Sequence, residues 1–133
     1  ASVRFTGFRR DAANLMNAID IMALPSHREP FGLVYLEAAI LQKPVVACAA
    51  GGALESIAHG ESGLLAPVGD EVGIAEAIGA LLDNRAWAGE LGRRGRERVI
   101  DLFNWNRFTR RLETVYEKVL AGDASATPRR DAA

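Results

Sequence analysis

The chain has 133 residues, of which 49% are hydrophobic, and a formal net charge of −1 at pH 7. This size and composition predict one small globular domain with its own core, and the near-zero charge gives no reason to expect nucleic acid as a partner. No apolar run is long enough to span a bilayer, and the N-terminus lacks a secretory pattern. We therefore expect a cytoplasmic protein with Cys48 as a buried thiol, and leave open peripheral attachment of a longer form to a membrane.

Apolar runs of strand length alternate with helical patterns in the first part of the chain. The run at residues 21–24 is short, apolar and ended by Pro25, which is typical of a strand buried in a parallel sheet. Alternating strands and helices imply right-handed crossovers, so we predict an α/β fold with a Rossmann-like parallel sheet flanked by helices. The predicted strands are residues 4–5, 21–24, 45–47 and 63–66, and the predicted helices are residues 11–18, 32–41, 54–58 and 70–82.

Beyond Asn84 the sequence is helical in character. Two apolar stripes at helical spacing, separated by an Asn104 helix cap, predict two closing helices. The tail at residues 122–133 has no apolar periodicity and is predicted to be disordered, which leaves residues 1–121 as the domain. The stripes are Trp87, Leu91, Gly95, Val99 and Phe103, then Phe108, Leu112, Val115, Tyr116 and Val119.

Four arginines lie close together among the residues of the first stripe. A patch for a polyanion is one interpretation, but acidic residues interleave with the arginines at the spacing of helical ion pairs. We therefore predict a solvated, salt-bridged helix face. The arginines are Arg93, Arg94, Arg96 and Arg98, and the acids are Glu90, Glu97 and Asp101.

The most informative segment joins the strand at residues 21–24 to a helix that opens at Gly32. The first amides of a helix have no intrahelical acceptor and carry the positive end of its dipole, so they can receive a phosphate. We expect Gly32 to let the anion approach without a side chain in the way. The amides concerned are those around Phe31, Gly32, Leu33 and Val34.

Two glutamates flank this expected phosphate position. Glu37, in the second helical turn, can accept two hydrogen bonds from the vicinal hydroxyls of a ribose. Glu29, in the loop before the helix, can accept hydrogen bonds from whatever group the diphosphate carries. A sugar is the natural candidate for that group.

Other candidate residues have two interpretations of similar weight. Gly51 and Gly52 form only a turn, or they bring backbone amides to the ligand. His27 is a surface residue, or it lines a sugar pocket. His59 is expected in a turn, and no cluster of side chains has metal-ligand spacing, so we predict no metal site.

The segment Glu-Pro-Phe-Gly-Leu at residues 29–33 follows Leu-Pro-Ser, and its two glutamates are separated by seven residues. It resembles the donor-site signature of retaining glycosyltransferases of the GT-B fold, especially family four (group 1). Two positions depart from the family pattern: Leu54 stands where proline is frequent, and Asn104 stands where serine or threonine is frequent. Further segments resemble the family in the same order, namely residues 3–7, 43–47, 51–55, 60–65 and 103–105.

The resemblance implies the C-terminal, sugar-nucleotide-binding part of such an enzyme, incomplete at its N-terminus. The acceptor-binding domain, and the upstream arginine and lysine that grip the diphosphate, would be absent. A UDP-, GDP- or ADP-sugar would donate a hexose-type sugar without any cofactor, and the leaving phosphate would take the acceptor's proton. Glu29 would be the catalytic residue that orients the sugar, while His27, the helix start, Glu37 and the two glycines bind the donor.

Two alternatives stay open at this point. One is a non-catalytic module that binds nucleotide or a partner protein, and the other is a sugar-nucleotide epimerase. An oxidoreductase is disfavoured because residues 6–10 lack a glycine-rich fingerprint. Alone, the chain is expected to be inactive and to self-associate through an exposed sheet edge.

Overall fold

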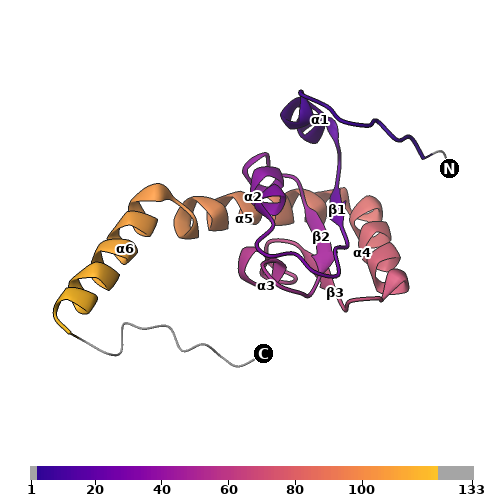
Figure 1. The fold of residues 1–133 in the computed structure, drawn as a ribbon. Coiled ribbons are helices and arrows are strands. Elements are labelled where there is room, and N and C mark those ends of the chain that lie inside the picture. Colours follow the sequence, from indigo (N-terminus) through magenta and orange to yellow (C-terminus); the bar gives the residue numbers. More distant parts are fainter. Residues whose placement is uncertain (1–2, 123–133) are drawn as a thin grey trace. The chain divides into compact units, whose positions relative to one another are not determined.

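A parallel sheet of three strands, in the order β1-β2-β3, forms within the first of two compact units (Figure 1). The structure is a computed structural model that describes residues 3–122, which divide into two compact units on either side of the boundary between Ile100 and Asp101. Met22 pairs with Val45 across the first two strands, and Val46 pairs with Leu64 across the next two. The predicted α/β class is confirmed. The strands are β1 (Met22–Leu24), β2 (Val45–Cys48) and β3 (Leu64–Ala66).

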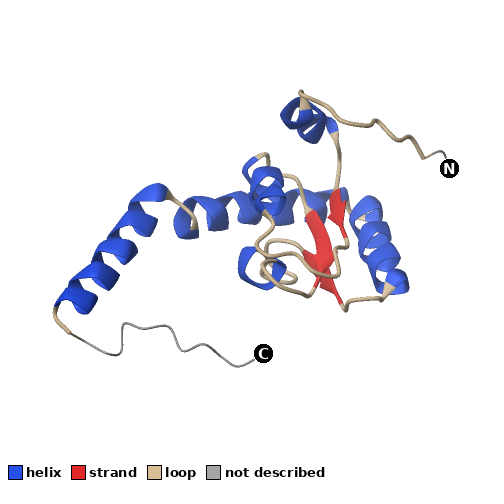
Figure 2. Cartoon of the chain, viewed as in Figure 1, coloured by secondary structure: helices blue, strands red, loops and turns tan. Residues whose placement is uncertain are grey.

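Helices and strands alternate along residues 12–83, and a second helix then follows directly (Figure 2). Every helix or strand predicted after residue 10 is present, with ends that differ by at most two residues, because apolar periodicity identifies elements better than it identifies their ends. The helices are α1 (Ala12–Ala18), α2 (Leu33–Ile40), α3 (Ala53–Ser56), α4 (Glu71–Asp83), α5 (Arg85–Leu102) and α6 (Trp105–Leu120).

The sheet has a hydrophobic core on each face, and β2 supplies both. Val45 and Ala47 belong to a cluster that includes Tyr35 of α2, whereas Val46 belongs to a second cluster that includes Leu81 of α4 and Leu91 of α5. Successive side chains of a strand point to opposite faces, so a central strand covered on both faces needs an unbroken apolar run. The sequence Val-Val-Ala-Cys provides that run.

Two predictions about the N-terminal part are wrong. Residues 4–5 form no strand, and the side chains of Val3 and Phe5 are 82% and 94% exposed. A strand is held by hydrogen bonds to a neighbour, and the sheet of the described residues ends at β1. As an edge strand β1 is itself only partly buried, with Ala23 exposed, whereas the sequence predicted full burial.

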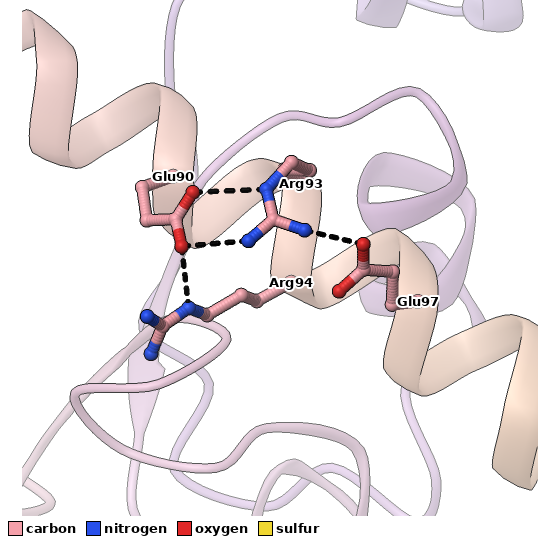
Figure 3. A network of polar contacts seen from close by, with 4 residues as sticks. All are labelled: Glu90, Arg93, Arg94 and Glu97. Carbon is pink, nitrogen blue, oxygen red and sulfur yellow. Dashed lines mark hydrogen bonds and ion pairs between the residues drawn. The ribbon is translucent and has the colours of Figure 1, made fainter.

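The arginines of α5 divide into two groups. Arg93 pairs with Glu90 (2.7 Å) and Glu97, and Arg94 pairs with Glu90 (2.7 Å), as predicted (Figure 3). The hydrogen bonds from Arg93 and then Arg94 lower the pKa of Glu90 to about 2.

Arg96 and Arg98 do not belong to this solvated face, which corrects the prediction. Arg96 donates to the carbonyl of Ile40 at the end of α2, and Arg98 donates to the carbonyls at the end of α3. The last carbonyls of a helix have no intrahelical donor and carry its negative end, so arginine is well suited to cap them. A Cβ on Gly92 would meet the carbonyl of Gln42, so α5 passes closely by the turn that follows α2.

The second unit contains α6, and Asn104 caps it as predicted. The Asn104 side-chain oxygen accepts a hydrogen bond from the Arg107 amide at 2.9 Å, and the rings of Trp105 and Phe108 lie 5.4 Å apart. The predicted tail, apart from Gly122 in a turn, lies outside the described residues. No described helix has the length and apolar character needed to cross a bilayer. The apolar residues of α6 are exposed: Trp105, Phe108, Leu112, Val115, Tyr116, Val119 and Leu120.

Candidate functional site

The predicted site residues lie on two loops at the carboxyl ends of adjacent strands. The Glu29 loop, residues 25–32, connects β1 to α2, and the glycine turn, residues 49–52, connects β2 to α3. Because neighbouring parallel strands end at the same edge, these loops meet, and the Gly52 amide donates to the Glu29 carbonyl at 2.9 Å. Open α/β sheets bind ligands at this edge.

The two loops are in contact backbone to backbone. Gly51 has φ +53°, and a Cβ there would meet the Glu29 carbonyl oxygen and lie 3.1 Å from its carbon. A Cβ on Gly52 would meet the Phe31 backbone. The sequence left open whether these glycines form only a turn or bring amides to a ligand. The Gly52 amide bonds to the protein's own loop. A role of the Gly51 amide toward a ligand stays a prediction.

Gly32 is a glycine for reasons internal to the protein. Its φ is +77°, and a Cβ would meet the Tyr35 ring and lie 3.0 Å from Glu29 Cγ. Gly32 is buried, so its missing side chain would point into the fold. The predicted access for an anion is not needed to explain this glycine, and it stays a prediction.

Tyr35, which sequence reasoning missed, lies beneath the Glu29 loop. It is 1% exposed, and its hydroxyl donates to the Leu24 carbonyl at 3.2 Å, at the end of β1. Burial, and after it the negative charge of Glu29, raises the pKa of Tyr35. A Cβ on Gly32 would touch both the Tyr35 ring and Glu29 Cγ, so the side chain of Glu29, a half-buried residue, lies near this ring.

The start of α2 presents backbone amides and an open face. Gly32, its N-cap, has no side chain that could accept a hydrogen bond from the first amides of the helix. Leu33 is 65% exposed and Val34 is half-buried. Glu37 is exposed and lies four residues after Leu33, hence on the same side of the helix. A carboxylate thus stands one turn beyond the positive end of the helix dipole.

His27 lies apart from these contacts, in the lining of a pocket of about 220 Å³ on the same edge of the sheet. Asp70 also lines the pocket and caps α4, since its carboxylate accepts from the Gly73 amide at 2.8 Å. Sequence reasoning did not bring His27 and Asp70 together, although both follow strand ends. Among the residues that the structure describes, no group of three metal-binding side chains is assembled. The remaining lining residues are Pro25, Cys48, Gly69, Glu71 and Ile74.

Solved structures define the class to which this fold belongs. HepE of Anabaena, in a complex with UDP-glucose, has a TM-score of 0.77 and 33% identity over 86% of this chain and 32% of that one. Sucrose-phosphate synthase of Thermosynechococcus elongatus has a TM-score of 0.73 and 40% identity over 81% of this chain and 27% of that one. The fold is that of the C-terminal domain of GT-B glycosyltransferases.

The family model for glycosyl transferases group 1 matches residues 1–84. N-acetyl-alpha-D-glucosaminyl L-malate synthase of Bacillus anthracis is 37% identical over 121 residues, or 91% of this chain and 32% of that protein. Glycogen synthase of Mycobacterium tuberculosis is 34% identical over 130 residues, or 96% of this chain and 31% of that protein. The chain belongs to the glycosyl transferases group 1 family, and it spans about a third of the length of these curated relatives.

Proposed function

We propose that this chain is the sugar-nucleotide-binding part of a retaining glycosyltransferase, of the family four type, that transfers a hexose-type sugar to an acceptor. The observation that carries the proposal is the arrangement at the start of α2, where Glu29 precedes the first amides and Glu37 follows them on an exposed face. The solved complexes of HepE contain UDP or UDP-glucose, which makes UDP the first donor nucleotide to test. GDP and ADP are the next.

Each part of this arrangement has a proposed task. The first amides of α2 hold the diphosphate, because a helix N-terminus favours negative charge. Glu37 accepts hydrogen bonds from the ribose hydroxyls, and Glu29 orients the sugar. The donor's leaving phosphate takes the acceptor's proton on the face that the sugar leaves, and the protein's contribution is orientation and charge stabilisation.

The test of this division of roles compares two glutamate variants by calorimetry. Glu37→Ala is expected to weaken UDP binding by about 1.5–3 kcal/mol, because a hydrogen bond to a charged group is lost. Glu29→Ala is expected to leave UDP binding intact and to reduce sugar transfer in the full-length protein. Glu76→Ala, at an exposed position of α4, is the matched control. Equal UDP affinity in the Glu37 variant and the wild type would refute the ribose assignment.

A second experiment separates an enzyme from a non-catalytic module. The full-length protein is supplied with labelled UDP-glucose, and transfer or donor hydrolysis is measured beside the 133-residue chain. We expect turnover only from the full-length protein, because catalysis also needs a bound acceptor. We expect the shorter chain to self-associate in sedimentation through the β1 edge. Binding without turnover in the full-length protein would favour the module.

A further inference from the structure

We propose that Arg98 of α5 is a positioning residue for the Glu29 loop and acts on it through α3. The contacts between Arg98 and the loop stand independently of any ligand. The consequence for ligand affinity rests on the proposed function, in which Glu29 faces the sugar.

Arg98 holds the C-terminal end of α3. Its Nη2 donates to the Glu55 carbonyl at 2.9 Å, and its Nε donates to the Ser56 carbonyl at 3.3 Å. These two residues are the last of a helix with four residues, Ala53–Ser56. A helix this short has little stability of its own, so its position depends on the contacts made with the rest of the protein.

The same short helix contacts the Glu29 loop at both of its ends. At its N-cap, the Gly52 amide donates to the Glu29 carbonyl at 2.9 Å. At its last residue, the Ser56 hydroxyl, buried at 5% exposure, donates to the Phe31 carbonyl at 3.4 Å. Ser56 therefore joins Arg98 to the loop within a single residue, because its carbonyl accepts from Arg98 and its hydroxyl reaches Phe31.

The contact between α3 and the loop leaves no room for adjustment. The space where a Cβ of Gly52 would stand is filled by the Phe31 backbone, and the space beside Gly51 is filled by the Glu29 carbonyl. Backbone atoms cannot rotate away as the end of a side chain can. A shift of α3 that follows the loss of Arg98 is therefore transmitted to the main chain around Glu29.

The neighbouring arginines make different contacts and supply the control. Arg93 lies on the same helix, but its side chain bonds only to Glu90 and Glu97 among the interactions found in the described residues. Arg96 caps α2, whose first amides are proposed to hold the diphosphate. Loss of Arg98 should thus affect the sugar-facing loop more than the nucleotide-facing helix.

The experiment uses the full-length protein with Arg98→Met, Arg98→Lys, Ser56→Ala and the control Arg93→Met. Hydrogen exchange is followed in peptides that cover Gly52 and residues 29–33, and calorimetry gives the affinities for UDP and UDP-glucose. In Arg98→Met we expect faster exchange confined to these peptides, and an affinity for UDP-glucose reduced by about threefold to tenfold, a larger loss than for UDP. Arg98→Lys should show smaller changes in exchange and in affinity than Arg98→Met. Ser56→Ala should show the same faster exchange in these peptides. Arg93→Met should change neither exchange nor affinity.

Several outcomes would overturn the inference. One is unchanged exchange at Gly52 and residues 29–33 in both Arg98→Met and Ser56→Ala. Another is an increase in exchange spread equally over the whole first unit, because that would indicate general destabilisation. If Arg98→Met does not fold, Ser56→Ala and Arg98→Lys decide. If the wild type binds neither UDP nor UDP-glucose, the proposed function fails, and the exchange measurements still decide whether Arg98 positions the loop.

Discussion

Residues 3–8 and the Glu29 loop both run without helix or strand, yet their surroundings are opposite. In the first segment Phe5 and Phe8 are 94% and 90% exposed. In the second, Gly32 is buried and the main chain touches the glycine turn directly. Residues 3–8 have the composition of a strand but pair with no other strand among the residues that the structure describes, whereas the Glu29 loop has no regular structure and is fixed by contacts. Contacts across space, and not local propensity, decide which irregular segment has one conformation.

The sharpest test of this difference compares one glycine from each segment. Gly7 and Gly51 both have positive φ, +63° and +53°, but nothing lies within 4 Å of a Cβ on Gly7, whereas one on Gly51 meets a backbone carbonyl. Gly51→Ala should lower the free energy of unfolding by about 3 kcal/mol, through overpacking and backbone strain. Gly7→Ala should lower it by only about 1 kcal/mol, because the strain of the positive φ remains but no atom obstructs the added Cβ. Urea unfolding measures both, and equal losses would remove the distinction.

Replacing Gly32 should have a smaller effect than replacing Gly51. Its φ of +77° is as unfavourable for alanine, but the obstacle is the ring of Tyr35, a side chain that can give way in part. Gly32→Ala should therefore cost about 2 kcal/mol of unfolding free energy. Weaker UDP binding at unchanged stability would show instead that the glycine serves access for an anion.

Tyr35→Phe tests the bond beneath the loop and should cost about 1 kcal/mol at pH 8. The pKa of Tyr35 is raised in the folded protein, by burial and then by Glu29, so its contribution is complete below the ordinary tyrosine pKa and is lost as pH rises through the folded value. The stability difference between wild type and variant should narrow above about pH 10. A difference that stays constant from pH 8 to pH 11 would contradict this.

The smallest effect is expected from Phe5→Ser. A phenylalanine usually contributes strongly when buried, but this side chain is 94% exposed. The substitution should change the free energy of unfolding of the 133-residue chain by less than about 0.5 kcal/mol. Thermal unfolding would reveal a larger loss, and such a loss would mean that residues 3–8 are packed after all.

The sequence predicts the elements of this fold well because each depends on neighbours along the chain. The run Val-Val-Ala-Cys and the spacing of Leu91, Gly95 and Val99 are complete signals within a few residues. The strand at residues 4–5 was predicted wrongly because a strand also needs a partner. The motif around Glu29 and Glu37 lies at the carboxyl edge of the sheet, and the roles of both glutamates toward a ligand stay predictions.

What the sequence does not reveal are the contacts that hold the site. The need for glycine at position 51 becomes clear only when the Glu29 carbonyl is seen beside it. The need for glycine at position 32 becomes clear only when the Tyr35 ring is seen beside it. Arg98 bonds to carbonyls more than 40 residues earlier in the chain, since the sequence separations are 42 and 43 residues. A backbone carbonyl has the same chemistry in every residue, so no residue type marks the acceptor of such an arginine.

The close fit of α5 has a consequence for changes in chain length. A Cβ on Gly92 would meet the Gln42 carbonyl, and a Cβ on Gly95 would lie 3.2 Å from the Ser62 carbonyl oxygen. Arg96 and Arg98, which cap α2 and α3, follow within one turn of Gly95. Inserting or deleting one residue between Gly92 and Arg98 would rotate the residues after the change by about 100° relative to those before it. The helix would then keep either its close approach or its caps, but not both. Insertions and deletions should therefore be rejected within residues 92–98, a stretch of seven residues.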